Sequence, residues 1–395
     1  MDSEKILDKQ FVMTDTGRVD RIRDLYTTFN PDVDLDALKA SGYPAALDEM
    51  MEPVTMDYDD HAPKVIAYWA KRGLVKEFHG EDTPFSWTEY AAKTGYEWHE
   101  ADFGLPQNRH RRWNSFVPVS AFKPENKGKK YPVVVMLHGG MNPVSIIDGW
   151  GIPQEAARRE WIVIVPSIEL DDVVEDILKE AEALYPINRE RIYVAGFSYG
   201  GFMTNYLANK RPDIFAAAAV CGAPVSDSHT EKEAGAEPQP PYDKGYLGGD
   251  NYMPVINVSG NLDGYRFPIY NAGKKDGVYH VTPEQLTEGI NHWARVNKAT
   301  NIDIKDVYKL AGRTDITEAE RFIGIPLAEG CGRRVDADGL INYIGDLKST
   351  DGDARVRIMV EMNMPHWPTP EMARQIFEFF SHFKRNRETG ESIHE

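Results

Sequence analysis

The stretch from Gly196 to Gly200, with Ser198 at its centre, constrains this chain more than any other because of what stands on either side of it. A short apolar run at 192–195 precedes it and predicts a buried strand, and residues 202–209 predict a helix. A G-x-S-x-G pattern at a tight turn from strand to helix forces the serine into a strained backbone conformation and presents its hydroxyl to a cleft. The flanking glycines leave no side chain to block a substrate carbonyl. We therefore predict that Ser198 is a nucleophile.

A second interpretation of the same stretch stays open. Serine is a favoured N-cap residue, so Ser198 could do no more than cap the helix that follows a glycine-rich turn. The strand-turn-helix setting favours the catalytic role over the cap.

The composition narrows the class of protein. The 395 residues allow one enlarged domain or two smaller ones, and 62 acidic against 45 basic residues give a net charge of −17, which repels nucleic acid and anionic membranes. The two cysteines, Cys221 and Cys331, are typical of a reducing compartment. No signal peptide and no apolar stretch of membrane-spanning length is found. We expect a cytoplasmic protein that binds neither nucleic acid nor membranes, and the composition leaves a homo-oligomer open.

The chain divides into an N-terminal extension and one large domain. Residues 1–110 hold short helical patterns and then many aromatic residues, which predict a cap over a pocket or a cover for a sheet edge. Across residues 111–387, apolar runs typical of strands buried on both faces alternate with helical patterns. That alternation predicts a doubly wound, mostly parallel α/β sheet. We expect irregular, cap-like insertions at about 222–252 and 299–349, and a frayed tail at 388–395.

The expected strands and helices can be given by residue range. The strands are 112–119, 131–137, 161–165, 192–195, 214–220, 254–258 and 356–361. The helices are 153–159, 171–184, 202–209, 283–298 and 370–387.

Chemically useful side chains follow several of the predicted strands. Ligands of open α/β sheets bind at the carboxyl ends of the strands, and His138, Ser198, Asp263 and His366 all come after such ends. Hydrolysis by a serine needs a base to take its proton, a carboxylate to orient that base, and amide donors for the oxyanion. We therefore predict a triad of Ser198, Asp263 and His366, in an order along the chain that one known constellation shares.

Two members of this triad, Asp263 and His366, have competitors among residues of the same type. Asp263 could instead stabilise a turn, and Asp250 and Asp276 are rival carboxylates with worse placement. His366 lies in a loop between Pro365 and Pro368 that could hold an imidazole steady. We expect His280 and His292 to be bystanders.

The same strand ends supply the rest of the predicted site. The backbone N–H groups of Gly140 and Tyr199 are the expected oxyanion hole, and His138 is expected to shape its loop rather than act as a base. This chemistry needs no metal and no organic cofactor. Residues near the catalytic positions could line a substrate pocket or simply pack: His138, Gly139, Met141, Tyr265 and Trp367.

The sequence resembles the α/β-hydrolase superfamily, and within it the esterases grouped with polyhydroxybutyrate depolymerases and feruloyl esterases. The likeness is carried by residues 137–140, 187–201, 211–217 and 364–367, and it covers roughly residues 110–387. It implies a serine esterase that uses the predicted triad on a small soluble ester, such as a hydroxycinnamoyl or hydroxyacyl ester. Secreted members of that group usually carry a signal peptide, which this sequence does not show. The N-terminal extension and the two insertions match no known pattern.

Three alternatives remain beside the esterase. A peptidase of the same fold would use the same triad on amides. An acyltransferase would pass the acyl group to an acceptor other than water. A non-catalytic binding protein would keep the fold alone, since a fold does not establish a function.

Overall fold

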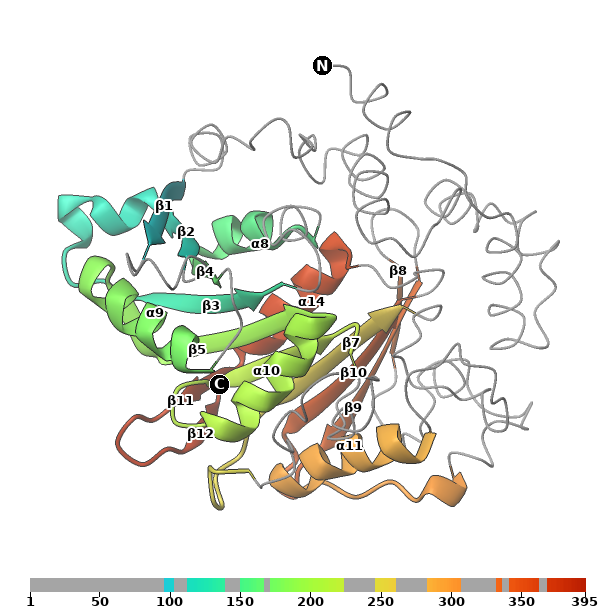
Figure 1. Ribbon diagram of the computed structural model, residues 1–395. Helices are drawn as coiled ribbons and strands as arrows, with labels where there is room; N and C mark the ends of the chain where they lie inside the picture. Colours follow the sequence, from blue (N-terminus) through green and yellow to red (C-terminus); the bar gives the residue numbers. More distant parts are fainter. Residues whose placement is uncertain are drawn as a thin grey trace, which may run out of the picture.

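Figure 1 shows the computed structural model of the chain. The structure describes residues 96–102, 112–138, 150–166, 171–223, 246–260, 283–306, 332–335, 341–361 and 368–395. The strands are β1 (Tyr96–Asp102), β2 (Arg112–Pro118), β3 (Tyr131–Leu137), β4 (Ile162–Pro166), β5 (Ile187–Phe197), β6 (Ala217–Cys221), β7 (Val255–Gly260), β8 (Gly332–Val335), β9 (Ile341–Lys348), β10 (Ala354–Glu361), β11 (Phe383–Arg385) and β12 (Ser392–His394). The helices are α8 (Ile152–Arg159), α9 (Asp171–Leu184), α10 (Tyr199–Lys210), α11 (Pro283–Val296) and α14 (Pro370–Ser381), with 3-10 turns η1 (Val119–Phe122) and η2 (Pro124–Asn126).

One large sheet organises these elements. Its strand order is β1-β2-β4-β3-β5-β6-β7-β10-β9-β8. The strands from β4 to β10 pair in parallel, while β1, β2, β9 and β8 add antiparallel pairs at the two sides. Parallel neighbours end at the same edge of a sheet, so β3, β5, β6, β7 and β10 all deliver the residues that follow them to one edge.

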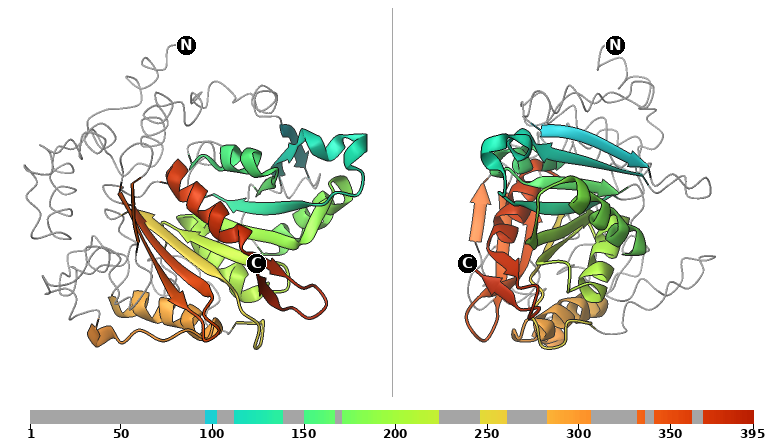
Figure 2. Two further views of the ribbon diagram at one scale, coloured as in Figure 1. Left: turned by 180° about the vertical axis from the view of Figure 1, so that it is seen from behind. Right: turned by 90° about the vertical axis from the view of Figure 1, so that its left-hand side faces the viewer.

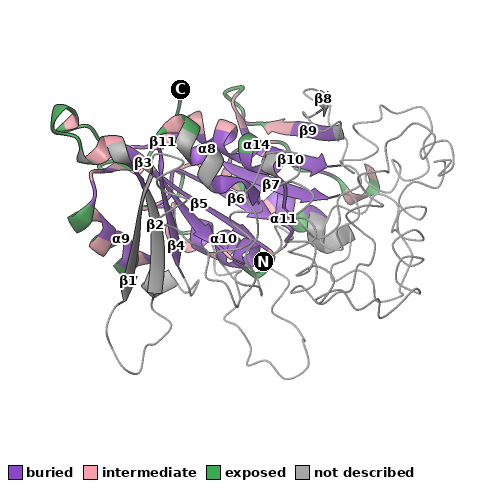
Figure 3. Ribbon diagram, turned by 90° about the horizontal axis from the view of Figure 1, so that it is seen from above, coloured by how far each residue is buried: buried purple, intermediate pink, exposed green. Residues whose placement is uncertain are grey.

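Helices cover both faces of the sheet. Helices α8 and α14 lie on one face and α9, α10 and α11 on the other, as the rear view in Figure 2 and the view from above in Figure 3 show. The central strands are largely buried, as in the run Val133–Leu137 of β3 and the whole of β6, while the first half of β5 is exposed at Arg189 and Glu190. Burying one such aliphatic side chain stabilises a fold by about 1.5–3 kcal/mol. Their continuous apolar sequences therefore follow from a sheet covered on both sides.

The predicted fold class is confirmed. Strand and helix alternate along the chain from β3 to β6, and the strand order is that of a doubly wound, mostly parallel α/β-hydrolase sheet. All seven strands expected from the sequence are present, with ends that differ by a few residues. The helix expected at 171–184 has those bounds.

The sheet extends further than the sequence predicted. Strand β1 lies within the predicted N-terminal extension but pairs antiparallel with β2, so the sheet begins before residue 111. Strands β8 and β9 lie within the predicted irregular insertion at 299–349 and continue the sheet beyond β10. These strands were missed because antiparallel strands near a sheet edge carry no continuous apolar run. Residues 1–95 and 224–245, which make up most of the extension and of the first insertion, lie outside the described residues.

The predicted frayed tail is wrong. Helix α14 ends at Ser381, six residues earlier than expected, and β11 and β12 then form an antiparallel hairpin. Arg385, which is 1% exposed, donates hydrogen bonds to the carbonyl oxygens of Phe215 at 2.7 Å and Tyr252 at 2.9 Å. The hairpin is thus fixed by contacts with residues far away in sequence, which a local pattern of charged residues does not reveal.

Length and hydropathy also bear on membrane insertion. Over the residues that the structure describes, no helix is both long enough and apolar enough to cross a bilayer.

Candidate functional site

Ser198 is the single residue between β5 and α10, and we call this turn from strand to helix the elbow. Its backbone has φ 56° and ψ −119°, a region that residues other than glycine rarely adopt. Its N–H donates to the carbonyl oxygen of Cys221 at 2.9 Å, which continues the pairing of β5 with β6. Its carbonyl oxygen accepts from the N–H of Gly201 at 2.9 Å and so starts the helix. The chain therefore passes from strand to helix within one residue, at a strain cost of about 1–3 kcal/mol.

The side chain of Ser198 does not cap α10. Ser198 holds the N-cap position, yet its hydroxyl oxygen accepts no capping hydrogen bond from an N–H of the first turn of the helix. The capping interpretation therefore does not account for a serine at this position. A strained conformation kept without a capping role points to function, because such strain is typical of active sites.

The glycines of the motif are required by close packing. A Cβ atom on Gly196 would lie under 3.0 Å from the backbone of Gly200, and one on Gly200 would lie under 3.0 Å from the carbonyl oxygens of Leu137 and His138. From the sequence, these glycines were expected to leave room for a substrate. The structure gives a different reason, because they let α10 approach both its own strand and the end of β3.

The strands that precede the predicted site residues end in one row. Phe197 at the end of β5 pairs with Cys221, Cys221 pairs with Val258 of β7, and Val258 pairs with Met359 of β10. Leu137 at the end of β3 pairs with Gly196. His138 and Ser198 thus leave the sheet at neighbouring positions. In the sequence, Asp263 comes three residues after the end of β7 and His366 five residues after the end of β10.

Several predicted site residues cannot be placed in this row. These residues lie outside the part of the chain that the structure describes: Gly139, Gly140, Met141, Asp263, Tyr265, His366 and Trp367. Their roles stay predictions. Of the predicted set, the structure places Ser198, Tyr199 and His138.

Tyr199 and His138 flank the nucleophile position. Tyr199 is the first residue of α10, and its side chain is 41% exposed beside Ser198. The N-terminal amides of a helix carry a partial positive charge, which suits an oxyanion donor at this residue. His138 is half-buried directly after β3, and its carbonyl oxygen faces the position that a side chain on Gly200 would fill.

The rival carboxylate Asp250 lies away from Ser198. Asp250 is in a turn before β7, and Leu247 of that turn donates its N–H to the carbonyl oxygen of Asn209 near the end of α10. Helix α10 runs away from Ser198 for 12 residues, or about 18 Å. Asp250 therefore sits at the opposite edge of the sheet. Asp276 and His280 lie outside the described residues.

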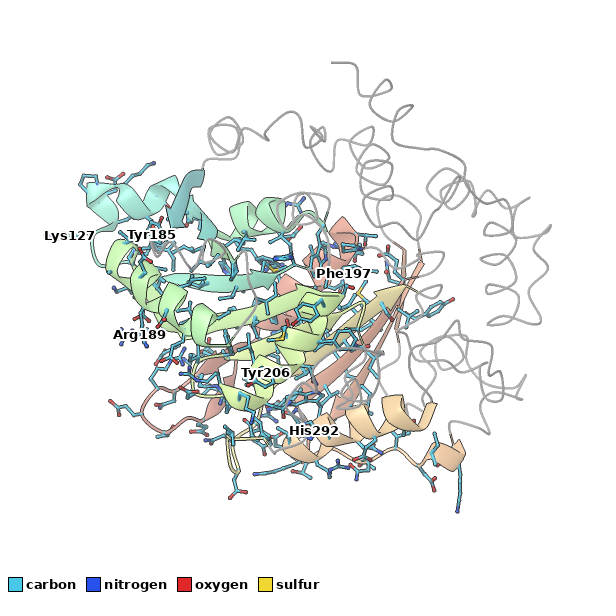
Figure 4. All side chains as sticks on the ribbon, in the orientation of Figure 1. Lys127, Tyr185, Arg189, Phe197, Tyr206 and His292 are labelled. Carbon is cyan, nitrogen blue, oxygen red and sulfur yellow. The ribbon has the colours of Figure 1, made fainter. Side chains whose placement is uncertain are left out.

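His292 has a structural role. Its Nε2 lies 2.7 Å from Oδ1 of Asn209, and its ring meets that of Trp293 edge to face with centroids 4.8 Å apart. Figure 4 shows His292 on α11, at a distance along the sheet from Phe197, which marks the elbow end of β5. His292 thus helps to join α11 to α10, as expected of a bystander.

Aromatic side chains pack behind the elbow, which was not predicted from the sequence. The ring of Phe197 meets that of Trp150 edge to face at 5.9 Å, and Trp150 is fully buried. Gly222, with φ 53°, leaves the space that the Phe197 ring occupies, since a Cβ there would lie 2.5 Å from the ring. An aromatic residue inside the G-x-S-x-G pattern is the signal that could have suggested such packing.

Cys221 contributes its backbone only. Burial raises the pKa of its thiol well above the ordinary value, so the thiol stays protonated and inert. Its carbonyl oxygen holds the N–H of Ser198, as described above. Among the described residues, no cluster of histidine, cysteine and acidic side chains could hold a metal ion.

A polar pair near the strand ends was also not predicted from the sequence. The hydroxyl of Thr369 donates to Oε2 of Glu361, the last residue of β10, at 2.8 Å, and both side chains are buried. A glutamate at the end of an otherwise apolar strand is the sequence signal that could have drawn attention to it.

Comparisons with known proteins agree with this geometry. Residues 167–262, which include the elbow, match the prolyl oligopeptidase family. The chain is 25% identical over 250 residues to poly(3-hydroxyalkanoate) depolymerase C of Paucimonas lemoignei, covering 54% of this chain and 58% of that protein. It is 27% identical over 161 residues to feruloyl esterase B of Piromyces equi, covering 40% of this chain and 27% of that protein.

One solved structure can be aligned with part of the chain. The feruloyl esterase module from Clostridium thermocellum, in complex with sinapinate, aligns with a TM-score of 0.38 and 14% identity over 69% of this chain and 83% of that one. The chain thus spans little more than half of one curated relative and about a quarter of the other. The names of both relatives are those of the group that the sequence motifs resemble.

Proposed function

We propose, from a chain that has the α/β-hydrolase fold, that it is a serine hydrolase that cleaves carboxylic esters through an acyl-enzyme. The observation that carries the proposal is the backbone of Ser198. It is strained at φ 56°, it stands at the sheet edge where neighbouring strands end together, and its side chain does not cap the helix. A structural serine would gain nothing from this conformation, whereas a nucleophile gains access to a substrate.

In the proposed mechanism, the hydroxyl oxygen of Ser198 attacks the ester carbonyl while His366 accepts its proton. Asp263 orients His366 and stabilises the imidazolium that forms. The N–H groups of Tyr199 and Gly140 hold the oxyanion, and each such donor is worth on the order of 100- to 1000-fold in turnover. The alcohol leaves with the proton from His366. Water then attacks the carbonyl of the acyl-enzyme while His366 accepts its proton, and His366 returns that proton to the Ser198 oxygen as the acid is released. The position of Asp263 and His366 after β7 and β10 in the sequence supports these roles.

The proposed substrate is a small ester with a hydroxycinnamoyl or hydroxyacyl group. Its support is the pair of curated relatives, one named for a hydroxyalkanoate polymer and the other for feruloyl esters. The exposed ring of Tyr199 next to the nucleophile offers a surface on which an aromatic acyl group could stack.

Hydrolysis of a substrate panel tests the proposal. We expect activity on p-nitrophenyl acyl esters or methyl hydroxycinnamates in the wild type and none in Ser198→Ala. The control is Ser381→Ala, at the far end of α14, where the hydroxyl donates to the carbonyl oxygen of Glu378. A fluorophosphonate adduct on Ser198, located by mass spectrometry, would identify the nucleophile directly. Equal activity in wild type and Ser198→Ala would rule the proposal out.

A peptidase is the second candidate, and the match of residues 167–262 to the prolyl oligopeptidase family favours it. The same nucleophile would then act on an amide. Matched substrates that share one acyl group and differ only in ester or anilide leaving group separate the two candidates. A kcat/KM for anilides that equals or exceeds that for esters would select the peptidase.

A further inference from the structure

A buried hydrogen bond joins the two ends of the segment that carries His366. Glu361 is the last residue of β10, and Thr369 directly precedes α14. Thr369 Oγ1 lies 2.8 Å from Oε2 of Glu361, and both residues are 0% exposed. The segment between them, 362–368, contains His366.

The Thr369 hydroxyl has a fixed direction. It accepts a hydrogen bond from the N–H of Met372 at 3.3 Å and so caps the N-terminus of α14. The N–H of Met372 donates to a lone pair of the hydroxyl oxygen, so the single proton of the hydroxyl stays available. The hydroxyl donates that proton to the Glu361 carboxylate. One side chain therefore ties the end of a strand to the start of a helix.

The strand end that receives this bond is itself held on both sides. Glu361 pairs with Gly260, the last residue of β7, and with Asn342 of β9. The proposed acid Asp263 follows that same Gly260 in the sequence. The start of the His366 segment and the start of the Asp263 segment thus leave the sheet side by side.

A carboxylate is an unexpected choice for a fully buried position in a sheet. Removing it from water is costly, and an apolar residue of similar size would give the sheet at least as much stability. Its nearness to the N-terminus of α14 offsets part of that cost. A buried polar pair that does not serve stability is best explained by a geometry that it specifies.

We propose that Glu361 and Thr369 are positioning residues for His366, acting as a brace across the ends of its segment. The inference rests on the proposed function, in which His366 is the base. The brace sets the separation and direction of the two ends, and so limits where the imidazole can lie relative to Ser198. A misplacement of about 1 Å at a catalytic group can lower turnover on the order of 100-fold.

The first test replaces the acceptor. Glu361→Met removes a buried carboxylate and leaves the Thr369 cap of α14 in place. The gain from no longer burying the carboxylate offsets the cost of leaving the Thr369 hydroxyl proton without its acceptor, so we expect thermal stability close to that of the wild type. We expect kcat for a p-nitrophenyl ester to fall by about 10-fold or more, with KM changed by less than about 2-fold. Loss of activity without loss of stability is a result that a purely structural role would not give.

The second test uses the donor, with a rescue and a matched control. Thr369→Val should lower kcat in the same way, while Thr369→Ser, which keeps the hydroxyl, should restore it to within about 3-fold. Thr287→Val makes the same change at another buried threonine, on α11, and should leave kcat unchanged. If Thr369→Val does not fold, Glu361→Met decides the question.

The outcomes separate this inference from the function on which it rests. A wild type whose Ser198 does not react with a fluorophosphonate would overturn the proposed function and the brace with it. A wild type that reacts, a His366→Ala variant that does not, and a folded Glu361→Met variant with the kcat of the wild type would overturn the brace alone.

Discussion

The backbone N–H of Ser198 donates to the carbonyl oxygen of Cys221 at 2.9 Å. This bond continues the pairing of two buried strands by one residue beyond the last residue of β5. Ser198 is therefore held as firmly as a strand residue while its φ of 56° already belongs to the turn. The rigid part of the fold thus fixes the backbone of the proposed nucleophile, and the strain is sustained by the sheet rather than by a loop.

This strain predicts a gain in stability when the side chain is removed. Ser198→Gly should raise the free energy of unfolding by about 1–2 kcal/mol, because glycine adopts positive φ at no steric cost. The same variant should have no activity. Urea denaturation measures the gain, and Ser198→Ala is the control, since alanine keeps the strain and loses only the hydroxyl. A Ser198→Gly variant less stable than Ser198→Ala would contradict the strain argument.

The packing at Gly200 predicts a loss of stability when a side chain is added. In Gly200→Ala the new methyl group would collide with the carbonyl oxygens of Leu137 and His138, both of them backbone atoms that cannot rotate away. We expect a loss of about 1–3 kcal/mol in the free energy of unfolding and a loss of activity. Gly249→Ala is the control, because its turn leaves open space around the added methyl group. That variant should keep its activity, although its φ of 59° makes alanine somewhat strained.

The parts of the fold that sequence reasoning predicted are those with strong local signals. The helix from Asp171 to Leu184 and the buried run of β3 have periodic or continuous apolar patterns, which burial on one or both faces imposes. Strands β8 and β9 were missed because their place in the sheet depends on the pairing of β9 with β10 and of β8 with β9, and pairing between strands is not a property of a single segment. The hairpin of β11 and β12 was missed for a similar reason.

The candidate site likewise contains one part that could be predicted from the sequence and other parts that could not. Ser198 was predicted from a motif whose chemistry and geometry are local, and the strained backbone agrees with it. The hydrogen bond between Glu361 and Thr369 could not be predicted, because it depends on how α14 returns against the end of β10. The reason why residue 200 must be a glycine could not be predicted either, since the atoms that exclude a side chain there belong to β3 and the residue after it.

The stability of the fold is predicted to depend on one buried guanidinium in the C-terminal hairpin. Arg385 donates to the carbonyl oxygens of Phe215, Tyr252 and Gly390, and burial lowers its pKa below the ordinary arginine value. Arg385→Met would leave these carbonyls without their donor, so we expect a loss of about 3 kcal/mol or more in the free energy of unfolding. Arg189→Met, which removes an exposed ion pair to Glu182, should cost less than about 1 kcal/mol. Similar losses in the two variants would contradict this account.

Glu155 on α8 and Glu175 on α9 predict opposite pH dependences of stability. Burial raises the pKa of Glu155 above 4.5, against the pull of nearby arginines and with a further rise from Glu371. Hydrogen bonds from Lys179 and then Arg211 lower the pKa of Glu175 below 4.5. An acid with a raised pKa binds its proton more tightly in the folded state, so its contribution to stability is complete below the ordinary pKa and is lost as pH rises. For a lowered pKa the contribution is complete above the ordinary pKa and is lost as pH falls.

Glutamine variants test the two opposite pH dependences of stability, because a glutamine does not titrate. Relative to the wild type, Glu155→Gln should gain in free energy of unfolding as pH rises through the raised pKa of Glu155. Glu175→Gln should lose relative to the wild type as pH rises from below the lowered pKa of Glu175 towards 4.5, and it serves as the matched control of the same chemical change. Urea denaturation at intervals from acid to neutral pH gives both curves. Curves of the same slope would show that the buried position of Glu155 between α8 and α14 does not set its titration.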